Sequence, residues 1–168
     1  MSETRDVQTL LSQMAGDLQS LLDSRHITDP AIIGIHTGGA WIAEQIHQQL
    51  NPEQPLGTLN ITFYRDDFTR IGLHPQVEPS NLPFSVDDRH IILIDDVLHT
   101  GRTIRAAMNE IFDYGRPASI ILAVLVERSG RELPICADVA GQRLQPAPHQ
   151  HVKLTGPDPL ELLIQESK

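Results

Sequence analysis

The sequence is poor in several residue types that mark particular classes of protein. Its 168 residues include one cysteine, Cys136, so an internal disulfide cannot form. No apolar run approaches the roughly 20 residues that a membrane-spanning helix needs. No basic segment followed by an apolar segment marks a secretory signal at the N-terminus. These absences exclude a disulfide-stapled domain and a membrane span, and they predict a cytoplasmic protein.

Positive charge is scarce as well. The formal net charge is -9, the pI is near 5.2, and only Lys153 and Lys168 among the 13 basic residues are lysines. Generic nucleic-acid binding needs clustered cations, so the composition argues against it. The other basic residues are arginines, whose planar guanidinium suits bidentate phosphate recognition. A local basic face is therefore compatible with the acidic composition.

The chain is long enough to form one domain with a substantial core, and we expect a single domain over residues 1–168. Helical and strand patterns alternate along it. This alternation predicts an α/β fold with a mostly parallel central sheet flanked by helices. The expected helices are about 4–23, 40–50 and 103–112, and the expected strands are about 31–35, 59–64, 90–94 and 119–126.

The segment from Ile91 to Thr103 is the most informative part of the chain. It predicts a buried strand that ends in the carboxylates of Asp95 and Asp96, then a loop of small residues, then a helix. Carboxylates can accept hydrogen bonds from sugar hydroxyls or bind Mg²⁺ through water, and a helix N-terminus binds phosphate. The segment therefore predicts a site for a phosphorylated sugar at the carboxyl end of the sheet. The alternative is a polar strand end followed by a helix cap.

Two further loops follow predicted strands. Residues His36–Gly39 contain two adjacent glycines, which let the backbone approach a diphosphate closely. Residues Arg65–Asp67 open a stretch to residue 88 that contains three prolines and little periodicity. We expect this stretch to be a flexible functional loop whose arginine closes over a diphosphate. The alternative for His36–Gly39 is an ordinary strand-to-helix turn. The alternative for Arg65–Asp67 is a solvated charge cluster.

Residues 91–103 also resemble the phosphoribosyl-diphosphate (PRPP) signature of type I phosphoribosyltransferases. Over a longer span, from about Ile32 to the C-terminus, the chain resembles the PyrR family. Members of that family regulate pyrimidine operons by attenuation and act as uracil phosphoribosyltransferases. The resemblance implies the type I phosphoribosyltransferase fold, with a small hood formed by about 127–150 and the N-terminal region. The segments that carry it are 61–67, 95–108, 115–117, 123–128 and 131–135.

The resemblance implies roles for individual residues, of which Asp95, Asp96 and Arg65 would be catalytic. The two aspartates would hold the ribose hydroxyls, and Thr100–Thr103 would hold the 5′-phosphate. Mg²⁺ would bridge the diphosphate without a direct protein ligand. The full implied PRPP-binding set is Asp95, Asp96, Val97, Leu98, His99, Thr100, Gly101, Arg102 and Thr103, and the diphosphate-binding set is Thr37, Gly38, Gly39 and Arg65.

The implied reaction converts uracil and PRPP to UMP and diphosphate. The implied partners are PRPP, uracil, UMP, UTP and the leader RNA of the pyrimidine operon, with no membrane partner, in a homodimer or homotetramer. Two alternatives are a phosphoribosyltransferase of another base and a nucleotide-sensing regulator with vestigial catalysis. The chain departs from the common family pattern at Gly38 (usually arginine), His99 (tyrosine), Cys136 (arginine) and Gln142 (lysine).

Overall fold

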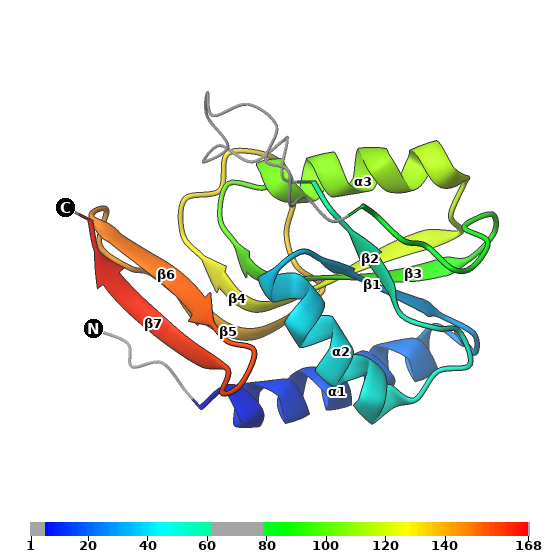
Figure 1. Cartoon of the computed structure of the whole chain (residues 1–168), viewed down its shortest axis with the longest axis horizontal. Helices are drawn as coiled ribbons and strands as arrows, with labels where there is room; N and C mark the ends of the chain where they lie inside the picture. Colours follow the sequence, from blue (N-terminus) through cyan, green and yellow to red (C-terminus); the bar gives the residue numbers. More distant parts are fainter. Residues whose placement is uncertain (1–5, 62–78, 168) are drawn as a thin grey trace.

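A five-stranded parallel sheet forms the centre of the protein (Figure 1). The computed structural model describes residues 6–61 and 79–167. The strand order is β2-β1-β3-β4-β5, which confirms the predicted α/β class with a parallel central sheet. The strands are β1 (Ala31–Ile35), β2 (Gly57–Leu59), β3 (His90–Leu98), β4 (Ser119–Arg128) and β5 (Val139–Leu144).

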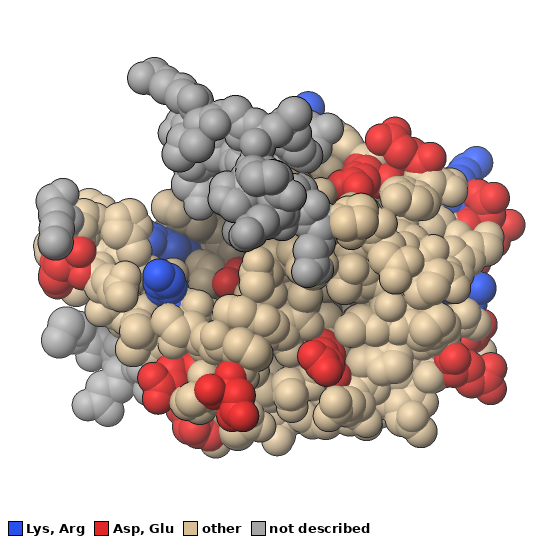
Figure 2. Space-filling model, viewed as in Figure 1, with Lys and Arg blue, Asp and Glu red and all other residues tan. Residues whose placement is uncertain are grey.

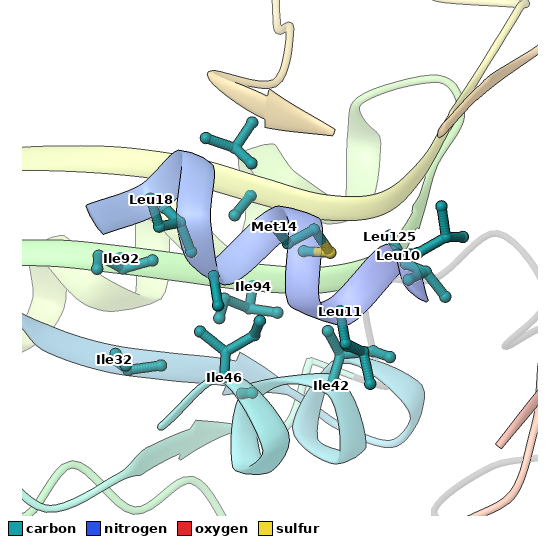
Figure 3. Close-up of a cluster of buried hydrophobic side chains, with 14 of the residues drawn as sticks. Leu10, Leu11, Met14, Leu18, Ile32, Ile42, Ile46, Ile92, Ile94 and Leu125 are labelled. Carbon is teal, nitrogen blue, oxygen red and sulfur yellow. The ribbon is translucent and has the colours of Figure 1, made fainter. Parts of the chain in front are cut away.

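Helices cover both faces of this sheet. Helices α1 (Val7–Ser24) and α2 (Gly38–Leu50) pack on one face, and α3 (Arg102–Tyr114) packs on the other. Successive residues of a strand point to opposite faces. Accordingly Ile92 and Ile94 join the cluster under α1 and α2 (Figure 3), whereas Ile91 and Leu93 join the cluster under α3. The central strands are therefore apolar on both faces, as a covered parallel sheet requires.

Local signals explain where α1 begins and where α2 ends. The side chain of Asp6 caps α1 by accepting a hydrogen bond from Thr9 N at 3.0 Å. Helix α2 ends at Leu50, and the capping residue Asn51 adopts the left-handed conformation (φ 48°) before Pro52. Helix α2 begins at Gly38, two residues earlier than expected, and so includes both glycines of the predicted diphosphate loop.

Strand β3 extends beyond the acid pair. We expected it to end at residue 94, but it continues to Leu98 because Val97 and Leu98 still pair with Val126 and Glu127 of β4. The predicted strand at 59–64 overlaps β2 at Leu59 alone. Residues 60 and 61 are not in a strand, and residues 62–64 lie outside the described residues.

Only the second part of the predicted loop at 65–88 lies within the described residues. The chain returns beside β2, where Asn81 forms an antiparallel bridge with Thr58. Next to this bridge the Ser80 hydroxyl accepts a hydrogen bond from Asn60 N at 2.9 Å. The same hydroxyl donates to the Glu110 carboxylate of α3 at 2.6 Å. The segment is thus fixed to both the sheet and α3 as it leads into β3.

A separate antiparallel hairpin stands beside the main sheet. Its strands are β6 (Gln150–Thr155) and β7 (Glu161–Glu166), which among the described residues pair only with each other, in a two-stranded sheet (Figure 1). We expected the small hood at about 127–150 together with the N-terminal region, and this assignment stays a prediction. Residues 139–144 form β5, which covers the edge of β4, and α1 packs into the main core because its apolar stripe is buried against the sheet.

The hairpin is attached at both of its ends. At the first, the Arg128 guanidinium at the end of β4 donates to Gln150 O at 3.1 Å, and partial burial lowers the pKa of this arginine from its usual value. At the turn between β6 and β7, Gly156 lies against α2. A Cβ at this position would be 3.2 Å from the Trp41 ring. Between them, Leu154 and Leu162 join the core under α1 and α2. The hairpin therefore spans from the end of β4 to the start of α2.

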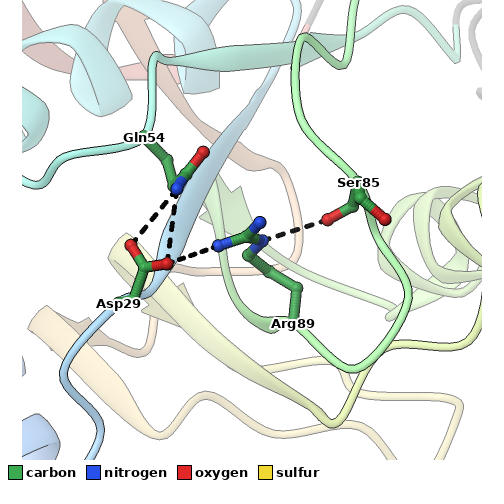
Figure 4. Close-up of polar contacts among 4 residues, drawn as sticks. All are labelled: Asp29, Gln54, Ser85 and Arg89. Atoms are coloured by element: carbon green, nitrogen blue, oxygen red, sulfur yellow. Dashed lines mark hydrogen bonds and ion pairs between the residues drawn. The ribbon is translucent and has the colours of Figure 1, made fainter.

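A polar network ties together the amino ends of the strands (Figure 4). Arg89, just before β3, pairs with Asp29, just before β1, at 2.7 Å and donates to Ser85 O at 3.0 Å. Gln54, on the way to β2, also donates to the Asp29 carboxylate. This network stabilises the end of the sheet opposite the predicted site.

Within the described residues no helix has the length and apolar character to cross a membrane.

Candidate active site

The acid pair lies at the carboxyl end of β3. Asp95 is 2% exposed and is the one charged side chain in the described part of the chain that is buried. Its carboxylate accepts a hydrogen bond from Asp96 N at 2.9 Å, and the Asp96 carboxylate accepts one from Val97 N at 2.8 Å. These local bonds hold the two carboxylates in defined orientations.

The glycine loop after β1 lies directly against this acid pair. A Cβ at Gly38 would collide with the Asp96 carboxylate, and a Cβ at Gly39 would lie 2.7 Å from Ile94 O and 2.9 Å from Asp95 Cα. The backbone atoms beside Gly39 require glycine there, whereas at Gly38 a side chain would displace the Asp96 carboxylate. The amino end of α2 lies beside the carboxylates as a result, and backbone amides at the start of a helix are suited to bind an anion.

The loop after β3 leads into the start of α3, where the phosphate loop was predicted. Gly101 precedes the helix with a φ of 97°, a conformation that favours glycine. Arg102 N donates to the Thr100 hydroxyl at 3.2 Å. The carbonyl of Thr100 accepts hydrogen bonds from Glu132 N and Leu133 N at 3.0 and 3.1 Å. The segment after β4 thus holds the Thr100 carbonyl, and with it the predicted phosphate loop, in position.

These elements and the hairpin enclose one cavity of about 780 Å³. In Figure 2 it is the hollow between the hairpin and the body of the protein, where both basic and acidic side chains are visible. Most of the predicted site residues line it: Thr37, Gly38, Asp95, Asp96, Val97, Leu98, His99, Thr100, Gly101 and Thr103. The structure therefore brings the predicted diphosphate loop, acid pair and phosphate loop into one space.

Of the other three predicted residues, two do not line the cavity and one lies outside the described residues. Gly39 packs against the backbone of β3 and does not line the cavity. Arg102 also lies off the cavity and pairs with Glu132 at 3.5 Å on the surface. Arg65 falls outside the described residues.

Sequence reasoning missed the residues that the hairpin contributes. His151 and Lys153 of β6 and Gln165 of β7 line the cavity, together with Trp41 of α2. His151 and Gln165 are register partners, and Lys153 follows two residues after His151, so all three lie on one face of the hairpin. The alternation of polar residues from His149 to Lys153 was the available signal, but it does not show which part of the chain that face meets.

His99 occupies a defined place at the rim of the cavity. Its side chain is exposed, and a Cβ at Gly130 would lie 2.7 Å from His99 Nε2. Gly130 has a φ of 111° and follows β4 in the segment that covers the phosphate loop. Because glycine has no side chain, Gly130 leaves room for the His99 imidazole.

The site is suited to Mg²⁺ that arrives with a phosphorylated substrate. No group of three or more His, Cys, Asp or Glu residues in the described ranges 6–61 and 79–167 could hold a metal ion alone. Mg²⁺ commonly binds through one or two carboxylates together with substrate phosphates and water. Asp95 and Asp96 supply two carboxylates beside the two anion sites, so the residues present fit a substrate-bound ion.

Comparison with known proteins agrees with this geometry. A family model described as phosphoribosyl transferase domain matches residues 5–155. A purine phosphoribosyltransferase from Pyrococcus horikoshii superposes with a TM-score of 0.61 at 23% identity, covering 83% of each chain. An HGPRT-ase from Leishmania tarentolae in complex with GMP superposes with a TM-score of 0.64 at 18% identity, covering 84% of this chain and 78% of the other. The fold and the site define a phosphoribosyltransferase, and the chain belongs to the phosphoribosyl transferase domain family.

Closer relatives specify the branch of that family. Bifunctional protein PyrR from Nitrosococcus oceani is 62% identical over 162 residues, which cover 95% of this chain and 92% of the relative. Bifunctional protein PyrR from Pseudomonas aeruginosa (strain LESB58) is 57% identical, covering 91% and 90%. The chain is accordingly a member of the PyrR family, as the sequence resemblance indicates.

Proposed function

We propose that this protein transfers the phosphoribosyl group of PRPP to uracil, forming UMP and diphosphate. The observation that carries the proposal is the convergence of three elements on one cavity: the acid pair, the glycine loop and the phosphate loop. The volume of about 780 Å³ lies within the range of about 300–1,000 Å³ typical of small-molecule sites. Two anion sites on either side of two carboxylates match a sugar that carries phosphate groups at both ends.

In this proposal each element acts on one part of PRPP. The amides and hydroxyls of Thr100–Thr103 hold the 5′-phosphate at the start of α3, and Asp95 and Asp96 accept hydrogen bonds from the ribose 2′- and 3′-hydroxyls. Positive charge develops on the ribose ring as the bond to diphosphate breaks. Fixed carboxylates near that ring stabilise the charge electrostatically. The amides at the start of α2, beside Gly38, receive the leaving diphosphate.

Mg²⁺ completes the diphosphate site in this proposal. When bound, the ion neutralises the charge of the leaving diphosphate. Asp95 and Asp96 would contact it through water, because both carboxylates border the space between the glycine loop and the phosphate loop. Arg65, which lies outside the described residues, is the further proposed contact to the diphosphate.

We propose that the hairpin selects the base. Strand β6 pairs only with β7 within its small sheet, so its other edge offers backbone N–H and C=O groups, and β6 residues line the cavity. Uracil presents alternating carbonyl and N–H groups, which such an edge can match by hydrogen bonding. The segment from about Val126 to Ile135 would close the same side, because it packs on the phosphate loop.

A base-specificity assay tests the proposal. Purified protein with PRPP and Mg²⁺ should convert uracil to UMP, and hypoxanthine or guanine should give much slower turnover. Preferential use of a purine would favour the alternative of another acceptor base. Binding of UMP without turnover on any base would favour a nucleotide sensor with vestigial catalysis.

We further propose that the protein regulates the pyrimidine operon by binding its leader RNA in response to UMP or UTP. The name bifunctional protein PyrR, carried by relatives that are more than half identical over nearly the whole chain, supports this second role. The groove between α1 and β5 is lined by Asp17, Asp138 and Arg143 and is unsuited to RNA phosphates. RNA would therefore use another face. A gel shift on the leader RNA at low salt with UMP should detect a complex, and no shift would contradict this role.

We also propose that the protein is a homodimer or homotetramer. Light scattering coupled to size-exclusion chromatography should give two or four times the chain mass of 18.7 kDa. A mass of one chain would contradict the proposal.

A further inference from the structure

Lys153 has an unusual position for one of the two lysines of the chain. It is on β6 of the hairpin and lines the proposed PRPP cavity. Among the described residues that line this cavity, it is the one lysine or arginine, and the other charged residues there are Asp95 and Asp96. The positive charge that this part of the chain can present to a ligand in the cavity therefore comes from Lys153.

The side chain of Lys153 is presented by a rigid support. Its neighbours Val152 and Leu154 pack into the core under α1 and α2, and Leu154 is 6% exposed. Because side chains alternate along a strand, Lys153 lies on the opposite face of the hairpin. Lys153 is exposed and makes no ion pair with any residue within 6–61 or 79–167. Within these ranges no ion-pair partner thus accounts for its charge.

The course of the hairpin places Lys153 toward one end of the cavity. Strand β6 begins beside Arg128 at the end of β4, and the turn after it reaches Trp41 at Gly156. Trp41 is in the first turn of α2, three residues after Gly38. Lys153 is three residues before Gly156, on the half of β6 that approaches α2. Among the β6 residues that line the cavity, Lys153 is therefore nearer than His151, along the strand, to the end of the hairpin that meets α2.

We propose that the ammonium group of Lys153 binds the diphosphate of PRPP. This inference rests on the proposed function and assigns the ligand group that the Lys153 side chain recognises. The diphosphate is a polyanion, and both acidic side chains of the cavity add further negative charge beside it. Gly38 has no side chain that could offset this charge. A lysine at this position supplies a compact cation where negative charge grows as diphosphate leaves.

The proposal is distinguishable from recognition of the base by the same lysine. PRPP contains the diphosphate, whereas UMP contains the base and the 5′-phosphate without it. Calorimetric titration in Mg²⁺ buffer should show that Lys153→Met weakens PRPP binding roughly 10- to 100-fold, the range for loss of a charge-assisted hydrogen bond. UMP affinity should change less than about twofold, and the KM for uracil should stay near that of the parent protein. Lys153→Arg should retain most of the PRPP affinity.

Lys168→Met is the matched control because it removes the other lysine of the chain, and its PRPP affinity should equal that of the parent protein. Weaker UMP binding with unchanged PRPP binding in Lys153→Met would overturn the proposal in favour of base recognition. Equal binding of both ligands by Lys153→Met and the parent protein would also overturn it. A parent protein that binds PRPP but forms no UMP would contradict the proposed function, while the PRPP comparison would still decide the role of Lys153.

Discussion

Three glycine-to-alanine substitutions provide a graded test of the contact between the glycine loop and the acid pair. At Gly39 a new Cβ would lie 2.7 Å from Ile94 O and 2.9 Å from Asp95 Cα, both backbone atoms of β3. A carbon normally stays about 3.3 Å or more from a carbonyl oxygen, so α2 and β3 would have to separate by about 0.6 Å. At Gly38 the Cβ would instead meet the carboxylate of Asp96, which can swing away. Gly16 in α1 has nothing within 4 Å of its Cβ position.

These contacts translate into different expected changes in stability and turnover. Gly39→Ala overpacks rigid backbone at a cost of about 1–3 kcal/mol, and improved helix propensity returns at most about 1 kcal/mol. For a chain of this size the net loss corresponds to a fall in Tm of roughly 2–8 °C. Gly38→Ala should keep its Tm near that of the parent protein while displacing Asp96, with a fall in kcat/KM for PRPP of about tenfold or more.

Thermal unfolding and steady-state kinetics measured on the same preparations separate these effects. Gly16→Ala should raise the free energy of unfolding by about 0.5–1 kcal/mol and leave the kinetics unchanged. A Gly39→Ala variant as stable as Gly16→Ala would refute the close approach of α2 to β3. A Gly38→Ala variant with parental turnover would show that the Asp96 carboxylate need not occupy its present position.

The remaining predictions concern other parts of the structure. Asp96→Asn should lower kcat/KM about 100-fold or more with no change in Tm, because one fixed charge beside the ribose is lost; parental kinetics would rule out the ribose role. Arg89→Ala should destabilise the fold by about 1–2 kcal/mol through loss of charge-assisted hydrogen bonds to Asp29, discounted for their partial exposure. Its KM values should stay parental, since the network lies at the far end of the sheet. His99→Tyr introduces the residue common in the family and should alter kcat more than Tm, because His99 is exposed at the rim of the cavity; a loss of stability without a kinetic effect would contradict that placement.

The elements that sequence patterns predict well are those whose signal is local. The alternation of apolar strands and amphipathic helices depends on neighbouring residues, so the order of strands and helices through β4 could be predicted. The Asp95–Thr103 segment is likewise contiguous, and its strand, acids, loop and helix follow one another in the fold. The end of the strand in this segment was predicted less accurately. The polar acids interrupt the apolar run, but pairing with β4 extends β3 to Leu98.

The elements that could not be predicted depend on contacts distant in sequence. Strand β5 is short and mixed in polarity, and its strand conformation comes from pairing with the edge of β4. The hairpin meets the site because Trp41 contacts its turn, and these residues are more than 100 positions apart in sequence. No local pattern at Lys153 indicates that contact, so the hairpin side of the cavity was missed.

The most direct test of the central claim is a PRPP-dependent assay with competing bases. Purified protein, Mg²⁺ and PRPP are incubated with equal concentrations of uracil and hypoxanthine, and the nucleotides formed are separated and quantified. The account predicts that UMP is the main product, and that its formation requires both PRPP and Mg²⁺. Formation of the purine nucleotide instead of UMP, or of neither nucleotide, would contradict it.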